Sequence, residues 1–391
     1  MVLVVEHVID GNRTPEQPAP LLLGVSSMMT TLRIQDFRTF HKLTVEGLTR
    51  VSLLVGTNNA GKTSVLEAAE LVLGVGGTGP SILERSMFSR GELVLIRNSG
   101  SSYVEVNHLF HGHSLEPGKS FEITAVVGEK PRSFNCRIIP RPTGKLEGDD
   151  ETPPLELLRP GSNLAISISG DGMDPKGYIF PMTGYAIMTR LLRTAATAPA
   201  DKAWKVRFME TAAPPVSDLQ WLWDAVVLTP EEAKVTNALQ IIEPSIERLA
   251  AISSSGSRLD GSMFVKLRGS DERIPLGSMG EGIKRLLALS LNLVNSAGGY
   301  LLVDEIDTGL HHSVMTQMWR LVVEVARRLD IQVLATTHSL DCVRALASLY
   351  EESPDVRDLI SLHRIERGAE KSVPYSADEI LAASQHQMEL R

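Results

Sequence analysis

The chain has 391 residues, and its content of 43% hydrophobic and 22% charged residues is ordinary for a globular protein of two or three lobes. The formal net charge of −8 excludes nonspecific polyanion binding by the whole surface. No apolar stretch reaches the roughly 18 residues of a membrane span, and no basic region precedes the first apolar residues as in a signal peptide. Cys136 and Cys342 offer no disulfide framework, so we expect a cytoplasmic location.

Residues 1–28 predict an N-terminal appendage, because three prolines fall in a polar stretch ahead of the first strand-like pattern. Apolar and polar residues alternate over 31–40, which predicts a strand with one buried face, and a second strand is expected at 43–45. The apolar run 51–55 predicts a buried strand that leads into a glycine-rich segment.

That segment, residues 56–64, matches G-x-x-x-x-G-K-[ST] and is followed by a helical pattern. This is the context of a P-loop, in which backbone N–H groups at a helix N-terminus cradle phosphate oxygens. Lys62 is expected to reach the β- and γ-phosphates, and Thr63 to place its hydroxyl on Mg²⁺. The predicted nucleotide ligands here are Gly56, Asn58, Asn59, Ala60, Gly61, Lys62, Thr63 and Ser64.

The middle of the chain changes character twice. Short β segments separated by Gly, Asn and Ser fill 92–140 and predict an antiparallel meander, whereas the Pro-, Gly- and Asp-rich stretch 141–175 predicts a flexible insertion. Helical periodicity returns at 185–195, 216–227 and 230–251, the last with Thr229 as N-cap and Pro230 at the first helical position.

The last third alternates between helices and strands. The loop 278–282 precedes a helix at 283–294, an apolar strand at 300–305 that ends in two acids, a helix at 313–328 and a strand at 331–335. This βαβ order implies a parallel sheet, with the functional residues at the carboxyl ends of its strands.

Two of these strands end in chemically active side chains. Asp304 is expected to hold Mg²⁺ directly or through water, and Glu305 to act as general base for the attacking water. A pair of acids after a strand also suits a helix N-cap. His338 is expected to contact the γ-phosphate or orient the water; the alternative is a structural histidine.

Together these motifs resemble the ABC-type ATPase heads of the RecF, SMC and OLD class, over about residues 29–370. In chain order they are Phe37-Arg38-Thr39-Phe40, Gly56–Ser64 as Walker A, Ser278-Met279-Gly280-Glu281-Gly282 in the place of the signature loop, residues 303–311 as Walker B and D-loop, and Thr337-His338-Ser339 as H-motif. The resemblance implies an α/β fold, a P-loop ABC-type ATPase head with a parallel or mixed sheet, an antiparallel β lobe and a helical insertion lobe. The implied segments are the appendage 1–28, the head halves 29–140 and 263–391, and the insertion 141–262.

The resemblance also implies ATP and Mg²⁺ as cofactors and a homodimer that shares its ATP sites. In such heads each signature loop caps the ATP held by the other head, so Ser278, Gly280 and Gly282 would contact the partner's γ-phosphate at a helix N-terminus. Arg38 joins the predicted nucleotide ligands. The alternative is that the loop 278–282 only caps a helix.

The sequence departs from the pattern in two places. ABC heads usually carry a glutamine between Walker A and the insertion, but none occurs between Gln35 and Gln220, so that role is vacant or filled by another residue. His108, His111 and His113 lie near the expected place, as a metal site or as ordinary surface or core histidines. Only 53 residues follow His338, too few for the TOPRIM nuclease domain of OLD proteins, so ATP hydrolysis is the expected chemistry.

A basic cluster offers a possible DNA contact. Its members are Arg190, Arg193, Lys202, Lys205 and Arg207, with the aromatic Trp204 among them. Such a cluster suits a nucleic-acid backbone or an acidic partner, and the alternative is a solvated face.

The leading hypothesis is a homodimeric ATPase that serves as sensor or scaffold of a prokaryotic antiphage system, with a separate effector protein, for instance a nuclease. A RecF-like ATPase of DNA repair and recombination is the second hypothesis. An ABC transporter subunit is disfavoured, because the glutamine and the S-G-G-Q signature of transporters are absent.

Overall fold

The computed structural model describes residues 28–74, 80–95, 102–144, 146, 163–195, 204–252, 262–386 and 388. The predicted appendage 1–28 lies outside these residues except for Met28, whose carbonyl accepts a hydrogen bond of 2.8 Å from the N–H of Gly128. Residue 28 therefore contributes to the fold. None of the helices in the described part of the chain is long and apolar enough to cross a membrane.

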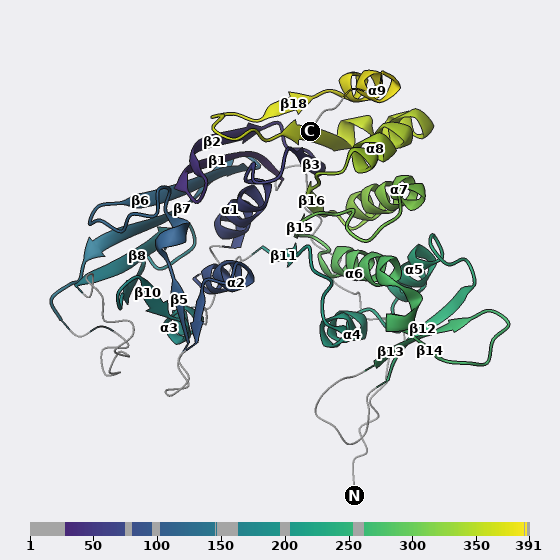
Figure 1. Ribbon diagram of the computed structural model, residues 1–391, viewed down its shortest axis with the longest axis horizontal. Coiled ribbons are helices and arrows are strands. Elements are labelled where there is room, and N and C mark those ends of the chain that lie inside the picture. The colour runs from purple at the N-terminus through teal and green to yellow at the C-terminus, as the bar shows by residue number, and fades with distance from the viewer. Residues whose placement is uncertain are drawn as a thin grey trace, which may run out of the picture.

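A mostly parallel sheet crosses the centre of the molecule (Figure 1). Within the described residues its strands are, in spatial order, β11 (Val206–Met209), β15 (Tyr300–Val303), β16 (Gln332–Thr336), β3 (Val51–Val55), β17 (Ile360–Arg364) and β18 (Val373–Tyr375). Only β18 runs antiparallel to its neighbour. The predicted parallel sheet is confirmed, and the P-loop strand β3 lies between the strands that carry His338 and the C-terminal segment.

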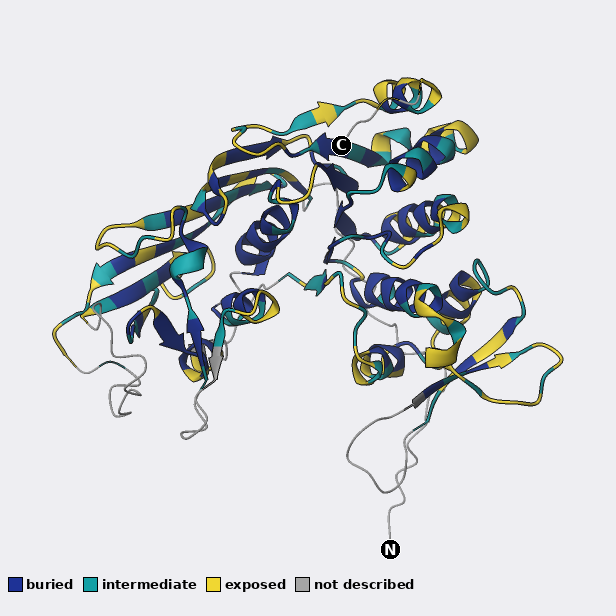
Figure 2. Ribbon diagram, in the orientation of Figure 1, coloured by how far each residue is buried: buried dark blue, intermediate teal, exposed yellow. Residues whose placement is uncertain are grey.

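Helices cover both faces of this sheet, because successive side chains of a strand point to opposite sides. Leu53 packs into the core beneath α6 (Glu281–Asn295), α7 (His312–Arg328), α8 (Leu340–Glu352) and α9 (Ala377–Gln385). Leu54 packs instead into a second core with α1 (Lys62–Gly74) and the antiparallel lobe. Figure 2 shows the buried residues along the sheet and the inner sides of these helices.

The antiparallel lobe lies on the α1 side. Its main sheet has the order β2 (Phe40–Glu46), β1 (Met29–Phe37), β6 (Ser120–Val127), β7 (Lys130–Pro140), β8 (Leu164–Gly170) and β9 (Tyr178–Pro181). A smaller sheet of β10 (Ala186–Met188), β5 (Ser102–Glu105) and β4 (Leu93–Leu95) packs with α2 (Ser81–Ser89) and α3 (Thr189–Ala195). The predicted antiparallel lobe is confirmed, although β4 and β5 belong to this second sheet, not to the meander.

The lobe extends past the predicted boundary at residue 140, because β8 pairs with β7 along most of its length. The insertion 141–262 thus contributes strands to both large sheets, as well as helices. Of the predicted flexible stretch 141–175, residues 145, 147–162 lie outside the described ones, whereas β8 is a regular strand.

A smaller lobe packs beside α6. It contains α4 (Val216–Asp224), α5 (Pro230–Leu239) and the sheet of β12 (Ile246–Ile252), β13 (Ser262–Leu267) and β14 (Ile274–Pro275). The predicted N-cap is present, since the Thr229 hydroxyl accepts from the N–H of Glu231. The predicted helix 230–251 is wrong beyond Leu239, because Pro244 disfavours helical backbone in the residue before it and cannot continue the helical hydrogen bonds.

Short 3₁₀ helices complete the described elements: η2 (Asn107–Leu109), η4 (Leu276–Met279) and η5 (Pro354–Leu359).

One buried side chain joins the two large sheets. Gln332, at the start of β16, accepts from the N–H of Met29 at 2.8 Å and donates to the carbonyls of Met29 and Thr49. This amide fixes where β1 begins relative to the parallel sheet.

Candidate active site

The glycine-rich turn after β3 has the backbone that its sequence requires. Gly56 has φ of 149°, and a Cβ on it would lie 2.4 Å from the carbonyl oxygen of Ile365. Gly61 has φ of 97°, and a Cβ there would lie 2.4 Å from the ring of Phe40. Only glycine fits both positions. The contact with Gly61 also gives a reason for the phenylalanine at the end of the Phe37-Arg38-Thr39-Phe40 motif, because the Phe40 ring packs against the P-loop turn.

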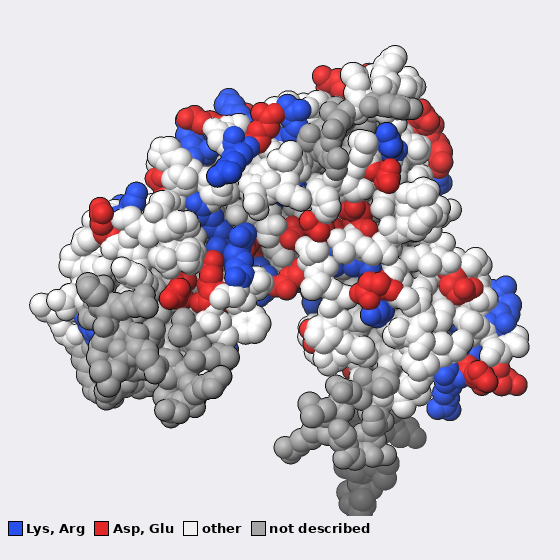
Figure 3. Space-filling model, in the orientation of Figure 1, with Lys and Arg blue, Asp and Glu red and all other residues white. Residues whose placement is uncertain are grey.

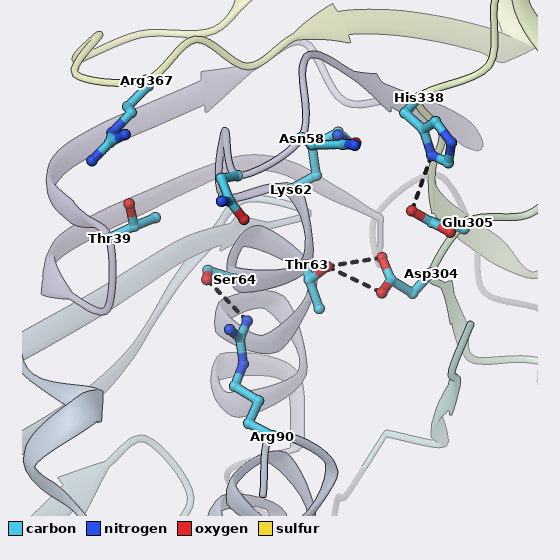
Figure 4. A pocket seen from close by; sticks show the side chains of 12 residues that line it. Thr39, Asn58, Lys62, Thr63, Ser64, Arg90, Asp304, Glu305, His338 and Arg367 are labelled. Carbon is cyan, nitrogen blue, oxygen red and sulfur yellow. Dashed lines mark hydrogen bonds and ion pairs between the residues drawn. The ribbon is translucent and has the colours of Figure 1, made fainter. Parts of the chain in front are cut away.

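This turn borders a cavity of about 740 Å³. It lies in the hollow between the lobes, where Figure 3 shows basic side chains on one side and acidic ones on the other. The lining residues, most of them labelled in Figure 4, are Thr39, Asn58, Asn59, Gly61, Lys62, Thr63, Ser64, Arg90, Asp304, Glu305, His338 and Arg367. Six of the predicted P-loop ligands thus face the cavity together with Asp304, Glu305 and His338. Gly56 and the buried Ala60 shape the turn without lining it.

The ammonium group of Lys62 is bound to the loop itself. It donates to the carbonyl oxygens of Gly56 and Thr57 at 2.8 and 3.0 Å. Burial lowers the pKa of Lys62, while the carboxylates of Glu305 and Asp304 act in the opposite direction. These contacts place the cation at the mouth of the turn, within the cavity.

The carboxylate of Asp304, directly after β15, is the acceptor for a set of threonine hydroxyls. Thr63 donates to it at 3.0–3.1 Å, Thr336 at 2.7 Å and Thr211 at 3.0 Å. Sequence reasoning missed Thr211, which follows β11 at the edge of the sheet. Its place beside Asp304 makes it a candidate for the role that the absent glutamine leaves open.

Glu305 and His338 form a second pair at the same edge. The Nδ1 of His338 lies 3.0 Å from Oε1 of Glu305, and the Thr308 hydroxyl donates to Oε2 at 3.3 Å. The Glu305 backbone is left-handed, with φ of 48°, and its N–H donates to the Thr336 hydroxyl at 2.8 Å. Such a conformation is unfavourable for a residue with a Cβ and is typical of functional sites.

A buried arginine on α6 holds the backbone beneath this pair. The guanidinium of Arg285 donates to the carbonyl oxygens of Glu210, Asp304 and Glu305 at 2.6, 2.8 and 2.9 Å. Burial lowers the pKa of Arg285, and the nearby carboxylates, Asp304 first, oppose this shift. The sequence signal was an arginine among the apolar residues of the predicted helix 283–294.

The predicted signature residues lie apart from the cavity. Ser278 falls in η4, and Gly280, with φ of 90°, is the N-cap of α6. Ser278 and Gly280 are exposed, and no side chain caps this helix end. Gly282 packs against the D-loop, since a Cβ on it would lie 3.0 Å from the Gly309 carbonyl oxygen. The helix N-terminus is therefore open to solvent in this chain.

Arg38 is committed to protein contacts rather than to the P-loop cavity. It is 6% exposed, and its Nε and Nη1 lie 2.7 and 2.9 Å from carboxylate oxygens of Glu67 and Glu92. Its backbone φ of 50° belongs to the tight turn between β1 and β2. The predicted nucleotide contact of Arg38 stays a prediction that would need rearrangement of these ion pairs.

The histidines near the absent glutamine do not form a metal site. Among the described residues no group of three or more His, Cys, Asp or Glu could hold a metal ion. His108, His111 and His113 belong to these described residues.

The predicted basic cluster is divided in the structure. Arg193 pairs with Glu84, and Arg207 donates to the Asn295 carbonyl and lies over the ring of Trp221, while Lys202 is outside the described residues.

The oxygen donors around Asp304 nevertheless suit a magnesium ion that is shared with phosphates. A hydroxyl from Thr63 and the Asp304 carboxylate converge within hydrogen-bond distance, and Mg²⁺ in such sites takes one or two protein oxygens besides water and phosphate. Bound there by Thr63 and Asp304, Mg²⁺ would neutralise phosphate charge.

The chain resembles several known proteins. A family model described as "AAA domain, putative AbiEii toxin, Type IV TA system" matches residues 222–342. A Helicobacter pylori protein named "ATP/GTP phosphatase" is 20% identical over 352 residues, 83% of this chain and 89% of that protein.

Among solved structures, the chain matches an SMC head bound to the winged-helix domain of ScpA at 14% identity and a TM-score of 0.43, over 89% of this chain and 98% of that one. A Pyrococcus furiosus SMC head bound to ScpA gives 12% and 0.45, over 92% and 99% of the two chains. The Thermotoga maritima SMC head gives 14% and 0.38, over 89% and 99%.

The fold and the site together define the class of the protein. The P-loop lies between β3 and α1, the Asp304–Glu305 pair follows β15, and His338 follows β16, which lies between β15 and β3. These are the parts of an ABC-type P-loop ATPase site. This arrangement is that of an ABC-type P-loop ATPase head, the fold that the sequence motifs predicted.

The position of Thr211 generates a prediction. Thr211→Val keeps the shape of the side chain but removes the hydroxyl that Asp304 accepts, so we expect ATP hydrolysis to fall about three- to tenfold, the worth of one hydrogen bond. The Mg²⁺ concentration for half-maximal activity should rise, and Thr211→Ser should restore both values. Thr236→Val, which removes a hydroxyl bonded within α5, is the matched control. Unchanged magnesium dependence in Thr211→Val would assign the residue no part in the metal site.

Proposed function

We propose that the chain hydrolyses ATP in the cavity at the carboxyl edge of the parallel sheet. The observation that carries this proposal is the convergence of Lys62, the Thr63–Asp304 pair and the Glu305–His338 pair on one space of about 740 Å³. A cavity of this size holds a nucleotide, and its positive and negative groups stand where phosphates and an attacking water need them.

Each side chain has a distinct task in this mechanism. The N–H groups at the start of α1 and the Lys62 ammonium bind the phosphates, for which Lys62 leaves the carbonyls of Gly56 and Thr57. Glu305 accepts the proton of the attacking water. His338 and Thr308 hold one carboxylate oxygen each, so the Glu305 side chain is positioned before substrate arrives.

Glu305→Gln should separate binding from chemistry. The amide keeps the shape and hydrogen bonding of the carboxylate but cannot accept a proton, so we expect hydrolysis to fall by about 10²- to 10⁴-fold. ATP affinity, measured by calorimetry, should stay near that of the wild type, whereas Lys62→Ala should abolish binding. Glu324→Gln on α7, outside the cavity lining, is the control. Hydrolysis by Glu305→Gln at the wild-type rate would remove Glu305 from the role of base.

We further propose a homodimer in which each chain completes the other's ATP site. The exposed N-terminus of α6, with Ser278 and Gly280 before it, offers backbone donors and the positive end of a helix dipole. In this chain it lies apart from the residues that line its own P-loop cavity. A phosphate presented by a second chain would use these donors, and ATP would then hold the two heads together.

A mixing experiment tests the shared site. Ser278→Arg adds bulk at the proposed contact and should block hydrolysis while its own P-loop still binds ATP. Mixed with Lys62→Ala, it should form heterodimers with one intact composite site, and steady-state hydrolysis of the mixture should exceed that of either variant alone. Ser217→Arg, an exposed serine on α4, should behave as the wild type. A mixture that forms heterodimers without regaining activity would show that the sites are not shared.

For the biological role, we propose the sensor or scaffold subunit of a prokaryotic antiphage system that acts in the cytoplasm through a separate effector protein. The resemblance of the motifs to OLD-like heads supports it, as does the description "putative AbiEii toxin, Type IV TA system" of the family model that matches residues 222–342. Among the described residues no group of three or more His, Cys, Asp or Glu could hold the metal ions of a nuclease.

Phage plating tests this role. The chain expressed together with its neighbouring genes should reduce the plating efficiency of sensitive phages by at least about tenfold, and Lys62→Ala or Glu305→Gln should remove the protection because ATP turnover drives the response. Expression of the chain without its neighbours should give no protection. Protection by the chain alone would contradict a separate effector, and none from the complete set of genes would contradict the defence role.

A further inference from the structure

A second cavity, of about 610 Å³, adjoins the P-loop cavity. Thr39, Ser64, Arg90 and Arg367 line both, so the two are continuous at this boundary. The further walls come from the segment 108–113, which supplies three imidazole rings, and from Gly368. We call this space the histidine cavity; nothing in the proposed mechanism uses it.

The cationic side chains of the histidine cavity are largely neutralised. Arg38 lies within 2.9 Å of Glu67 and Glu92, and Arg90 donates to Glu67 at 2.8 and 3.0 Å. Arg367 stands at the boundary between the two cavities, and the described residues show no carboxylate partner for it. The cavity is therefore poorly suited to a polyanion, and Arg367 stands at its entrance from the phosphate site.

Its imidazole rings offer flat, polar-edged surfaces instead. The rings of His108 and His113 lie edge to face, with centroids 4.9 Å apart, and the Nδ1 of His111 lies 3.1 Å from the Arg38 carbonyl oxygen. The segment is held against the turn before the P-loop, since the N–H of Arg38 donates to Leu109 and that of His111 to Asp36. These contacts form the cavity before any ligand enters.

The orientation of a bound triphosphate follows from the two ends of the P-loop cavity (Figure 4). Asp304, Glu305 and His338 stand at the end where hydrolysis takes place, so the γ-phosphate lies there. Thr39, Ser64, Arg90 and Arg367 stand at the opposite end, where the Arg90 guanidinium donates to the Ser64 hydroxyl at 3.2 Å. The rest of the nucleotide leaves past these residues and enters the histidine cavity.

On the basis of the proposed ATPase function, we propose that the histidine cavity binds the base and ribose of the nucleotide, with His108 and His113 in contact with the base. Its volume falls in the range of small-molecule sites, and aromatic rings stack well on nucleobases, which are uncharged. Arg367 then contacts the phosphate nearest the ribose. Recognition of the nucleoside is thus separate in space from binding of the γ-phosphate.

The test compares two probes, ATP and inorganic tripolyphosphate, which has the phosphates but no nucleoside. By calorimetry the wild type should bind ATP more tightly. The double variant His108→Ala with His113→Ala should bind ATP about tenfold more weakly, equivalent to about 1.4 kcal/mol. Its affinity for tripolyphosphate should not change, which also shows that the variant is folded. His108→Phe, which keeps a ring, should retain most of the ATP affinity, and His386→Ala on the C-terminal side of α9 is the control.

The outcomes separate this inference from the proposed function. Wild-type ATP affinity in the double variant, while Lys62→Ala binds neither probe, would overturn the nucleoside site and leave the ATPase proposal intact. Equal loss of affinity for both probes in the double variant would assign the histidines to the phosphates and likewise overturn it. A wild-type chain that binds neither probe would overturn both proposals.

Discussion

The carboxylate of Asp304 joins parts of the chain that the sequence keeps far apart. Its oxygens accept hydroxyls from the first turn of α1, from the segment after β11 and from the end of β16. A buried carboxylate needs such partners, because an unpaired charge in a partly dry site is costly. The same hydrogen bonds therefore satisfy the charge and set the spacing of the strands at the edge where the catalytic groups stand.

The two ends of the nucleotide site differ in how they are built. At the γ-phosphate end, short hydroxyl and imidazole contacts fix the acids before substrate binds. At the other end, a network of arginines and glutamates around the buried Glu67 ties the β1–β2 turn to α1 and to the segment after α2. In the proposed mechanism, chemistry and recognition of the nucleotide thus depend on separate sets of residues, contributed by the parallel sheet and by the antiparallel lobe.

Local patterns in the sequence were sufficient for the parallel sheet, its helices and the groups at its edge. The glycines of the P-loop, the Asp304–Glu305 pair and His338 follow apolar strands directly, so their placement depends only on βαβ order. Thr211 and Arg285 escaped prediction because their partners are 93 and 19 or 20 residues away and are contacted only after folding. The strand β12 differs from the predicted helix because the spacing of Ile246 and Leu249 fits a helix as well as a strand, whereas the backbone after Pro244 pairs with β13.

Arg285 has a mechanical consequence. It lies little more than one turn from the start of α6, at Glu281, and its guanidinium donates hydrogen bonds to the carbonyl oxygens of Asp304 and Glu305. Because an α-helix is stiff over so short a length, a displacement of the helix start at Gly280 would also displace the backbone of Asp304 and Glu305. The exposed helix end at Gly280 and the backbone of Asp304 and Glu305 are therefore linked through α6 and the single side chain of Arg285.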